Sequence, residues 1–506
     1  MAAPVIIYAL DAADLSLLEP WMAEGRLPHI AGLWRNSALR RIGGPGYWDE
    51  VGSWLTAYSG VPATQHGYYS ARRLKPGTYE LETEPLASAH ARPCWESSKN
   101  PNFRSLILDP IEVTPGAYTG GAQVHNLLAH QETYAAGPPF AIPDSARALV
   151  RRIWGRRRNP GFKQFHEPLD FYQRQLALNL DLSQRRRLLF HELIRGNEFD
   201  LLVVGINLHD IVHLLWPFQQ GRDDPRDPHR QLAHGVRTVY EEADREIGEI
   251  QKLLPPDSTE VLLSLYGVKD QYPTQELSQR LLELLGYQVP FTGDGVSWSP
   301  LGVARHLLPE SLRFQISALL PDRLQQSLLS SGFARSMDFR RSRAFVVPTG
   351  PGLFSSHIRV NLKGREPTGC VAPGRDYEEL INDLERQFRA LIDPVTGKPA
   401  VASVLRTANE FIDGPSQLLP DLFVHWKSSR HFLRSVVHPQ GEITQGRPHF
   451  FRDSFHGAPG FAAFRGPAIE PSASKDCSIL DIAPTLLRLL GEPPSASLPG
   501  RDALAS

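Results

Sequence analysis

Short apolar runs, each followed by a polar residue and then by a helical pattern, restrict this chain to a small set of folds. The first run spans residues 5–10 and ends at Asp11, and apolar residues at helical spacing follow from Leu15. Later runs of the same kind occupy residues 199–206, 260–265, 421–426 and 461–464. Strands that alternate with helices predict an α/β sandwich, in which helices cover both faces of a central, mostly parallel sheet.

Polar residues stand where several of these predicted strands end. In parallel sheets of this class, binding sites lie just beyond the carboxyl ends of the strands. Asp11 follows the first run, His209 and Asp210 follow the second, and Tyr266 follows the third. These four residues are therefore the first candidates for a functional site.

The charge of the chain argues against a polyanionic partner. Lys and Arg number 54 and Asp and Glu number 55, which leaves a formal net charge of -1 among 506 residues. No strong overall field is available to attract nucleic acid or an anionic membrane. We expect a small-molecule substrate, no nucleic acid and no membrane, while the oligomeric state stays open.

The compartment is predicted from two further features. The amino-terminal segment lacks the basic start and long apolar stretch of a secretion signal, and no segment approaches the roughly 18 to 20 apolar residues of a membrane span. Cys94, Cys370 and Cys477 are odd in number and far apart, which argues against a disulfide framework. These features indicate a reducing, cytoplasmic location.

Two stretches interrupt the alternation of strands and helices. Residues 85–195 are rich in Pro, Gly and Arg, and residues 295–335 are amphipathic at helical spacing. We predict loop and helix insertions, or cap elements near the site, within a single domain over residues 1–506. The basic run at 151–158 is most simply a solvated face, and a contact to an anionic substrate is the alternative.

Several segments resemble one known family in order and spacing. They are VIIYALDAAD with GRLPHIAGLW near the start, SWLTAYSGVPATQHGYYS at 53–70, DLLVVGINLHDIVHLLWPF at 200–218, IRVNLKGREPTGCVAPGRDYEEL at 358–380, LLPDLFVHW at 418–426, FHGAPGFAAFRGPAI at 455–469 and ILDIAPTLLRLLGEPPSASLPGR at 479–501. Together they resemble the type I phosphodiesterase and nucleotide pyrophosphatase branch of the alkaline phosphatase superfamily. The resemblance implies that superfamily's fold and a metal-dependent hydrolase.

Enzymes of this family bind two metal ions, usually zinc, roughly 4 Å apart, which activate a hydroxyl nucleophile and stabilise the attacking and leaving oxygens. The ligands are an Asp after the first strand, a Thr or Ser nucleophile, an Asp-His pair, an Asp-x-x-x-His pair and a late His. Asp11 matches the first of these ligands.

Two elements of the family pattern are replaced in this chain. The nucleophile position, four residues before Trp54, holds Glu50, and Ser53 and Thr56 are out of register with it. The usual Ser-Asp-His-Gly string reads Ser-Leu-Tyr-Gly at residues 264–267. Because leucine and neutral tyrosine are poor metal ligands, the resemblance predicts that this second metal site is lost or rebuilt.

The other metal site retains ligand-capable residues. Counting back from Trp216 places the Asp-x-x-x-His pair at His209 and His213, with Asp210 one residue on, and His456 matches the late histidine. Residues at i and i+4 share one helix face, so both imidazoles can bind one ion. The set predicts one divalent transition metal, first zinc, with iron or manganese as alternatives. A buried polar pair is the alternative interpretation.

These residues lead to two functional hypotheses. The first is a metal-dependent hydrolase-like enzyme that acts on a small ester or phosphoryl-type substrate, with direct attack by water. Glu50 and Asp11 would then be its catalytic groups, and Tyr266 would contact the substrate. The second hypothesis is a non-catalytic pseudoenzyme or binding protein that retains the family fold.

Overall fold

The chain is described from a computed structural model. Its described residues are 3–43, 51–83, 86–116, 120–128, 139–155, 167–219, 221–291, 322–349, 354–409, 414–446, 452–457, 459–493 and 497–505. By its internal contacts the chain divides into two compact units. The first comprises residues 1–69, 85–270 and 452–506, and the second comprises residues 70–84 and 271–451.

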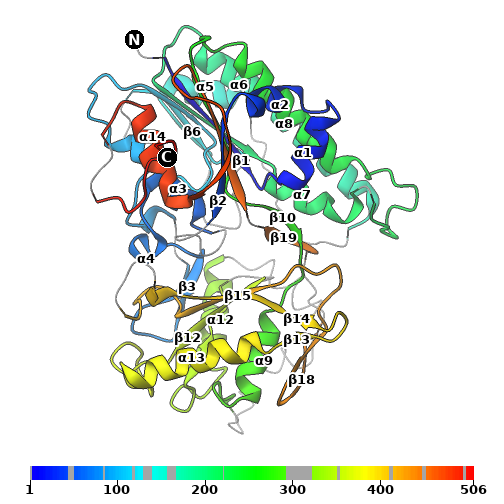
Figure 1. The fold of residues 1–506 in the computed structure, drawn as a ribbon, viewed down its shortest axis with the longest axis vertical. Coiled ribbons are helices and arrows are strands. Elements are labelled where there is room, and N and C mark those ends of the chain that lie inside the picture. The colour runs from blue at the N-terminus through cyan, green and yellow to red at the C-terminus, as the bar shows by residue number, and fades with distance from the viewer. Residues whose placement is uncertain are drawn as a thin grey trace. The chain divides into compact units, whose positions relative to one another are not determined.

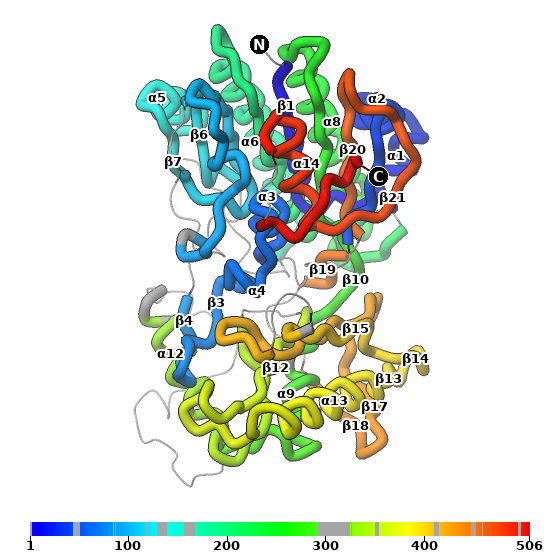
Figure 2. Tube along the Cα trace, turned by 60° about the vertical axis from the view of Figure 1, so that its left-hand side comes forward, coloured from blue at the N-terminus to red at the C-terminus, as the bar shows by residue number. Residues whose placement is uncertain are grey.

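A nine-stranded sheet forms the centre of the first unit, in the order β21-β2-β20-β9-β1-β8-β5-β6-β7. Figures 1 and 2 label β1 and β6 among its strands. Its strands are β1 (Val5–Asp11), β2 (Ala38–Gly43), β5 (Ser105–Leu108), β6 (Gly121–His125), β7 (Phe140–Ile142), β8 (Leu201–Asn207), β9 (Thr259–Ser264), β20 (Gly460–Arg465) and β21 (Ser472–Ser478). Five neighbouring pairs are parallel and three are antiparallel. The expected α/β fold with a mostly parallel sheet is thereby confirmed.

The two central strands are apolar because both of their faces are covered. Every residue of β1 and β8 is buried. Figure 1 shows α3 and α14 to one side of β1 and α2 and α8 to the other. The principal helices of this unit are α1 (Leu15–Ala23), α2 (Pro28–Arg35), α3 (Ser53–Ser59), α4 (Ala63–His66), α5 (Asp144–Ile153), α6 (Leu169–Ile194), α7 (His209–Leu215), α8 (Gly235–Gln251) and α14 (Ile482–Leu489).

Two sequence-based assignments differ in detail from the structure. The run at 421–426 forms β16 (Leu422–Trp426), which belongs to a four-stranded sheet of the second unit rather than to the main sheet. The run at 461–464 lies in β20, which pairs antiparallel with both of its neighbours. An apolar run predicts a buried strand, but it does not encode which strand will pair with it.

The two predicted insertions contain regular structure. Residues 85–195 supply β5, β6 and β7 to one edge of the main sheet (Figure 2), together with α5 and α6. Of residues 295–335, those up to 321 lie outside the described residues, as do residues 156–158 of the basic run. The remainder forms α12 (Asp322–Ala334), a helix of the second unit. A cap role near the site stays a prediction for both segments.

The second unit is built from small antiparallel sheets and helices. Its described elements include β3 (Arg72–Leu74), β4 (Leu81–Thr83), α9 (Gln275–Leu284), β11 (Ala344–Val346), β12 (Ser355–Val360), α13 (Arg375–Arg389), β13 (Ile392–Asp393), β14 (Lys398–Pro399), β15 (Val401–Arg406), β17 (Ser435–His438) and β18 (Gly441–Thr444).

The segment at 358–380 contains Arg365, whose guanidinium pairs with Asp421 at 2.7 Å and with Glu366 at 2.8 Å. All three side chains are buried. These contacts give that segment a structural role.

A buried ion pair joins α6 to α8 in the first unit. Arg186 donates from Nε and Nη2 to the two carboxylate oxygens of Glu246, at 2.8 and 2.6 Å. The side chains are 1% and 0% exposed. Removing one partner of such a pair leaves the other charge buried without compensation.

We predict that Glu246→Gln lowers the free energy of unfolding by about 3–5 kcal/mol, because Arg186 would lose its buried counter-charge. Glu249→Gln is the matched control on the same helix, since Glu249 pairs with Arg187 at 2.9 Å but is 47% exposed. That change should lower the free energy by less than about 1 kcal/mol. Urea unfolding measures the loss of unfolding free energy in both variants. Equal losses would contradict the claim that the buried Arg186–Glu246 pair matters more than the exposed one.

Candidate metal centre

Three buried histidines from two distant segments meet in the first unit. His209 and His213 lie one turn apart on α7, and His456 lies on β19 (Ser454–Gly457). One potential ligand atom from each lies within 4.8 Å of the others. The ring centroids are 4.6 Å apart for His209 and His213, 4.5 Å for His209 and His456, and 5.0 Å for His213 and His456. The structure thus brings together the three histidines that the sequence singled out.

The backbone explains how this cluster forms. Helix α7 begins two residues after β8 ends at Asn207, so its first turn lies at the carboxyl end of a central parallel strand. Strand β10 (Gly267–Asp270), which follows β9 after two residues, pairs antiparallel with β19. In that register Val268 is opposite His456. This pairing carries the late histidine to the ends of the central strands.

Other polar groups contact the cluster. His213 Nδ1 lies 2.8 Å from Ser454 Oγ. Arg452 Nη1 donates to His209 Nε2 at 3.0 Å. Asp210, predicted as a further ligand, lies with Oδ1 3.8 Å from His209 Nε2 and is outside the three-histidine group. Neither Arg452 nor Ser454 follows a central strand or matches the quoted family ligands, so sequence reasoning missed both.

Asp11 and Tyr266 form a second set of contacts beside the histidines. The Asp11 side chain is fully buried at the end of β1. Its Oδ1 accepts a hydrogen bond from the Tyr266 hydroxyl at 2.9 Å. The Trp54 indole N–H is shared between Asp11 Oδ1 at 3.3 Å and the Tyr266 hydroxyl oxygen at 3.0 Å. The Tyr266 and His456 ring centroids are 4.1 Å apart. An unbroken series of contacts therefore runs from Asp11 through Tyr266 to His456.

The beginning of α3 is occupied by a carboxylate from the chain itself. Glu50, at the nucleophile position, lies outside the described residues. The Glu112 carboxylate accepts hydrogen bonds from the backbone N–H groups of Gly52 at 2.8 Å and Trp54 at 3.0 Å. Glu112 has a φ of 49°, which is uncommon for a non-glycine residue. No motif in the sequence indicates this contact.

Thr56 and His66 form a buried structural pair. The backbone N–H of Tyr68 donates to His66 Nδ1, so the imidazole proton is on Nε2. That proton is directed to Thr56 Oγ1 at 2.9 Å, and the Thr56 hydroxyl donates to Gly52 O. Burial lowers the pKa of His66 to about 3. Thr56 therefore has a structural role in linking α3 to α4.

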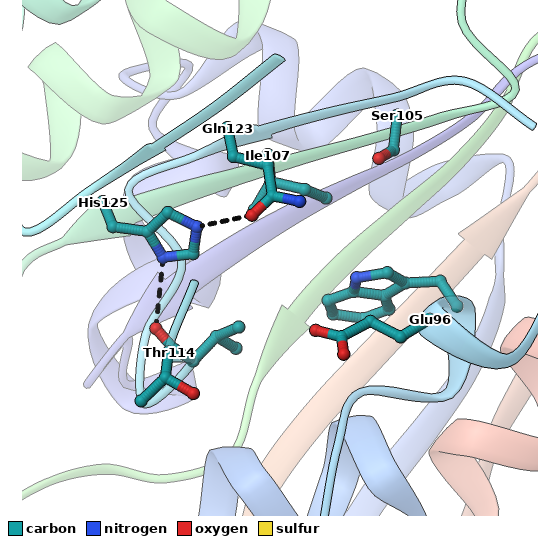
Figure 3. Close-up of a pocket in the computed structure, with 8 residues that line it drawn as sticks. Glu96, Ser105, Ile107, Thr114, Gln123 and His125 are labelled. Carbon is teal, nitrogen blue, oxygen red and sulfur yellow. Dashed lines mark hydrogen bonds between the residues drawn. The ribbon is translucent and has the colours of Figure 1, made fainter. Parts of the chain in front are cut away.

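Other histidines in the described part of the chain are not members of the three-histidine group, and His130 and His449 lie outside the described residues. His425 belongs to β16 of the second unit. His125 lies 3.3 Å from Gln123 Oε1 and 3.2 Å from the Val113 carbonyl, beside a pocket that Glu96 also lines (Figure 3). Burial lowers the pKa of His125 to about 4.

Comparison with solved structures shows what the arrangement resembles. Phosphonoacetate hydrolase from Sinorhizobium meliloti 1021 matches over 97% of this chain and 95% of its own, at 13% identity. The TM-score is 0.52 for its phosphonoformate complex and 0.50 for its phosphonoacetate complex. The chain has an alkaline-phosphatase-like fold. The fold predicted from the resemblance is thereby confirmed.

Murine ectonucleotide pyrophosphatase/phosphodiesterase 5 matches over 99% of this chain and 97% of its own, at 12% identity and a TM-score of 0.46. No family profile matches the sequence, and no curated protein matches it significantly. Among the described residues, no helix is both long and apolar enough to cross a membrane.

We predict that His66 makes the free energy of unfolding depend on pH in the acidic range. Its folded pKa of about 3 lies below the unfolded value of about 6.5. Its contribution is therefore complete above the unfolded pKa and is lost as the pH falls towards the folded value. In that window the unfolded state binds the extra proton, and the free energy of unfolding should fall by about 1.4 kcal/mol per pH unit from this group.

Urea unfolding from about pH 7 to about pH 5 measures this slope. His66→Gln is the comparison variant, because its amide can donate to Thr56 and accept from the Tyr68 N–H without titrating. The variant should show a shallower pH dependence than the wild type. Equal slopes of unfolding free energy against pH in the two proteins would contradict the claim that His66 causes the pH dependence.

Proposed function

We propose that this protein is a metal-dependent hydrolase with one metal site, formed by His209, His213 and His456. The observation that carries the proposal is the meeting of three buried imidazoles, with ligand atoms within 4.8 Å, beside the Asp11 and Tyr266 contact. The fold resembles that of a hydrolase with phosphonoacetate bound. The proposed substrate is a small ester or phosphoryl-type molecule.

The donor set suits a divalent transition ion. Three neutral imidazoles with a remaining open position form a typical catalytic zinc site, and iron or manganese can also use such ligands. When His213 donates its Nδ1 proton to Ser454, its Nε2 lone pair is available to an ion, and such outer contacts orient metal-binding histidines. An ion held there supplies Lewis acidity and can lower the pKa of water towards about 7.

The contacts of Asp11 favour one metal rather than two. In the family pattern this carboxylate shares an ion with an Asp-His pair, whose positions are Leu265 and Tyr266 here. Leu265 offers no ligand atom, and the Tyr266 hydroxyl donates to Asp11. Two neutral donors, the phenol and the Trp54 indole, thus satisfy a buried carboxylate that a second cation would otherwise neutralise.

The same region favours direct attack by water over a covalent intermediate. The Gly52 and Trp54 N–H groups already bind the Glu112 carboxylate, which would repel a substrate oxyanion at that point. We propose that Glu50 is the general base or orients the substrate. Asp11 would hold Tyr266 in position, and the Tyr266 ring would contact the substrate. Asp210 remains a proposed additional ligand.

Metal content tests the site directly. We predict one equivalent of transition metal per chain in untagged protein, and its loss in His213→Ala and His456→Ala, because each variant removes one of three ligands. His425→Ala, in the second unit, is the control and should retain the metal. Elemental analysis measures all four proteins. Two equivalents in the wild type, or full metal in His213→Ala, would overturn the proposal.

Turnover tests the chemistry. We predict activity on a member of a panel of phosphate, phosphonate, sulfate and carboxylate esters with added zinc, manganese or iron(II), and slow hydrolysis of generic aryl phosphodiesters. Glu50→Gln should lower the rate by about 10²- to 10⁴-fold while the metal is retained, because the base is lost.

Two other outcomes have clear meanings. A phosphorylated Ser53 or Thr56, trapped during rapid turnover, would contradict direct attack by water. Bound metal without turnover of any ester would instead favour the binding-protein alternative, which the loss of the Asp-His pair already supports.

A further inference from the structure

Arg452 contacts the three-histidine cluster through His209. Its Nη1 lies 3.0 Å from His209 Nε2, and its guanidinium carbon lies 5.4 Å from the centre of the Phe455 ring. A guanidinium is always protonated in proteins and only donates hydrogen bonds. His209 Nε2 must therefore accept, and the imidazole is neutral with its proton on Nδ1.

This bond is incompatible with a metal ion on His209. A neutral imidazole has one ring lone pair. If an ion binds Nε2, it takes the lone pair that Arg452 now uses. If it binds Nδ1, the proton moves to Nε2, and two N–H donors face each other. In either case the hydrogen bond from Arg452 must break.

Charge acts in the same direction. A divalent ion bound to His209 would lie close to the positively charged Arg452 guanidinium. The two positive charges would repel each other, and burial strengthens this repulsion because it limits solvent screening. His209, His213 and His456 are buried. Both hydrogen-bonding capacity and charge therefore place Arg452 in competition with the ion.

We infer that Arg452 is an intramolecular competitor of the metal, which releases His209 when the ion binds and then donates to an oxyanion. The inference rests on the proposed function, since it needs an ion at the three histidines. Released from His209, the planar guanidinium can make the paired hydrogen bonds that suit phosphonate, phosphate or carboxylate groups.

The competition implies reciprocal coupling between the metal and the anion. An oxyanion that binds Arg452 removes the competitor from His209, so it should raise metal affinity. By linkage, the metal must raise anion affinity by the same factor. Arg452 would thus favour assembly of the loaded site when an anionic ligand is present.

The test measures cobalt(II) affinity by calorimetry and by the visible spectrum of the bound ion. Arg452→Met retains a long side chain against Phe455 but removes the charge and the donors, so it should bind cobalt(II) roughly 10- to 100-fold more tightly than the wild type. Arg452→Lys keeps a charged donor and should stay near the wild type. Arg35→Met, which removes an exposed charge from α2, should change nothing.

A second titration tests the coupling with methylphosphonate as the probe. Saturating methylphosphonate should tighten cobalt(II) binding to the wild type several-fold or more, and less in Arg452→Met. Equal cobalt(II) affinity in the wild type and Arg452→Met would overturn this inference and leave the proposed function standing. Absence of cobalt(II) binding in both proteins would overturn both, and thermal melting confirms that the variants are folded.

Discussion

The hydrogen bond between Tyr266 and Asp11 connects the parts of this site. A fully buried carboxylate is unfavourable unless donors satisfy it, and here the donors are a phenol and the Trp54 indole. Trp54 comes from α3, and the Tyr266 ring packs on His456 of β19. One buried charge at the end of β1 thereby positions a helix, the start of β10 and the late histidine.

That arrangement determines the charge balance around the histidines. Neutral hydrogen-bond donors satisfy Asp11, while three imidazoles and one guanidinium contribute no negative charge to the candidate metal site. With the Asp210 carboxylate 3.8 Å from His209 Nε2, an ion bound there would keep part of its positive charge and would still favour an anionic or polarisable ligand. The same balance makes Arg452 a competitor of the ion, so affinity and ligand preference depend on one side chain.

Much of the architecture was predictable from local patterns. Continuous apolar runs located β1, β8 and β9 to within two residues, because strands buried on both faces need apolar residues throughout. Pairing was less predictable. Residues 421–426 form a strand of a different sheet, and residues 105–108 and 121–125 joined the main sheet from a stretch expected to be an insertion. Strand pairing depends on contacts between segments far apart in the chain.

The sequence by itself determined the identity of the groups that the structure brings together: histidines at 209 and 213 on one helix face, and Leu265 with Tyr266 where the family has a ligand pair. A helix period relates only residues a few positions apart. The register of β10 on β19 decided that His456 reaches His213 and that Ser454 lies beside it. Only the tertiary structure placed Arg452 on His209 and Glu112 on α3, because such contacts join distant segments and have no local periodicity.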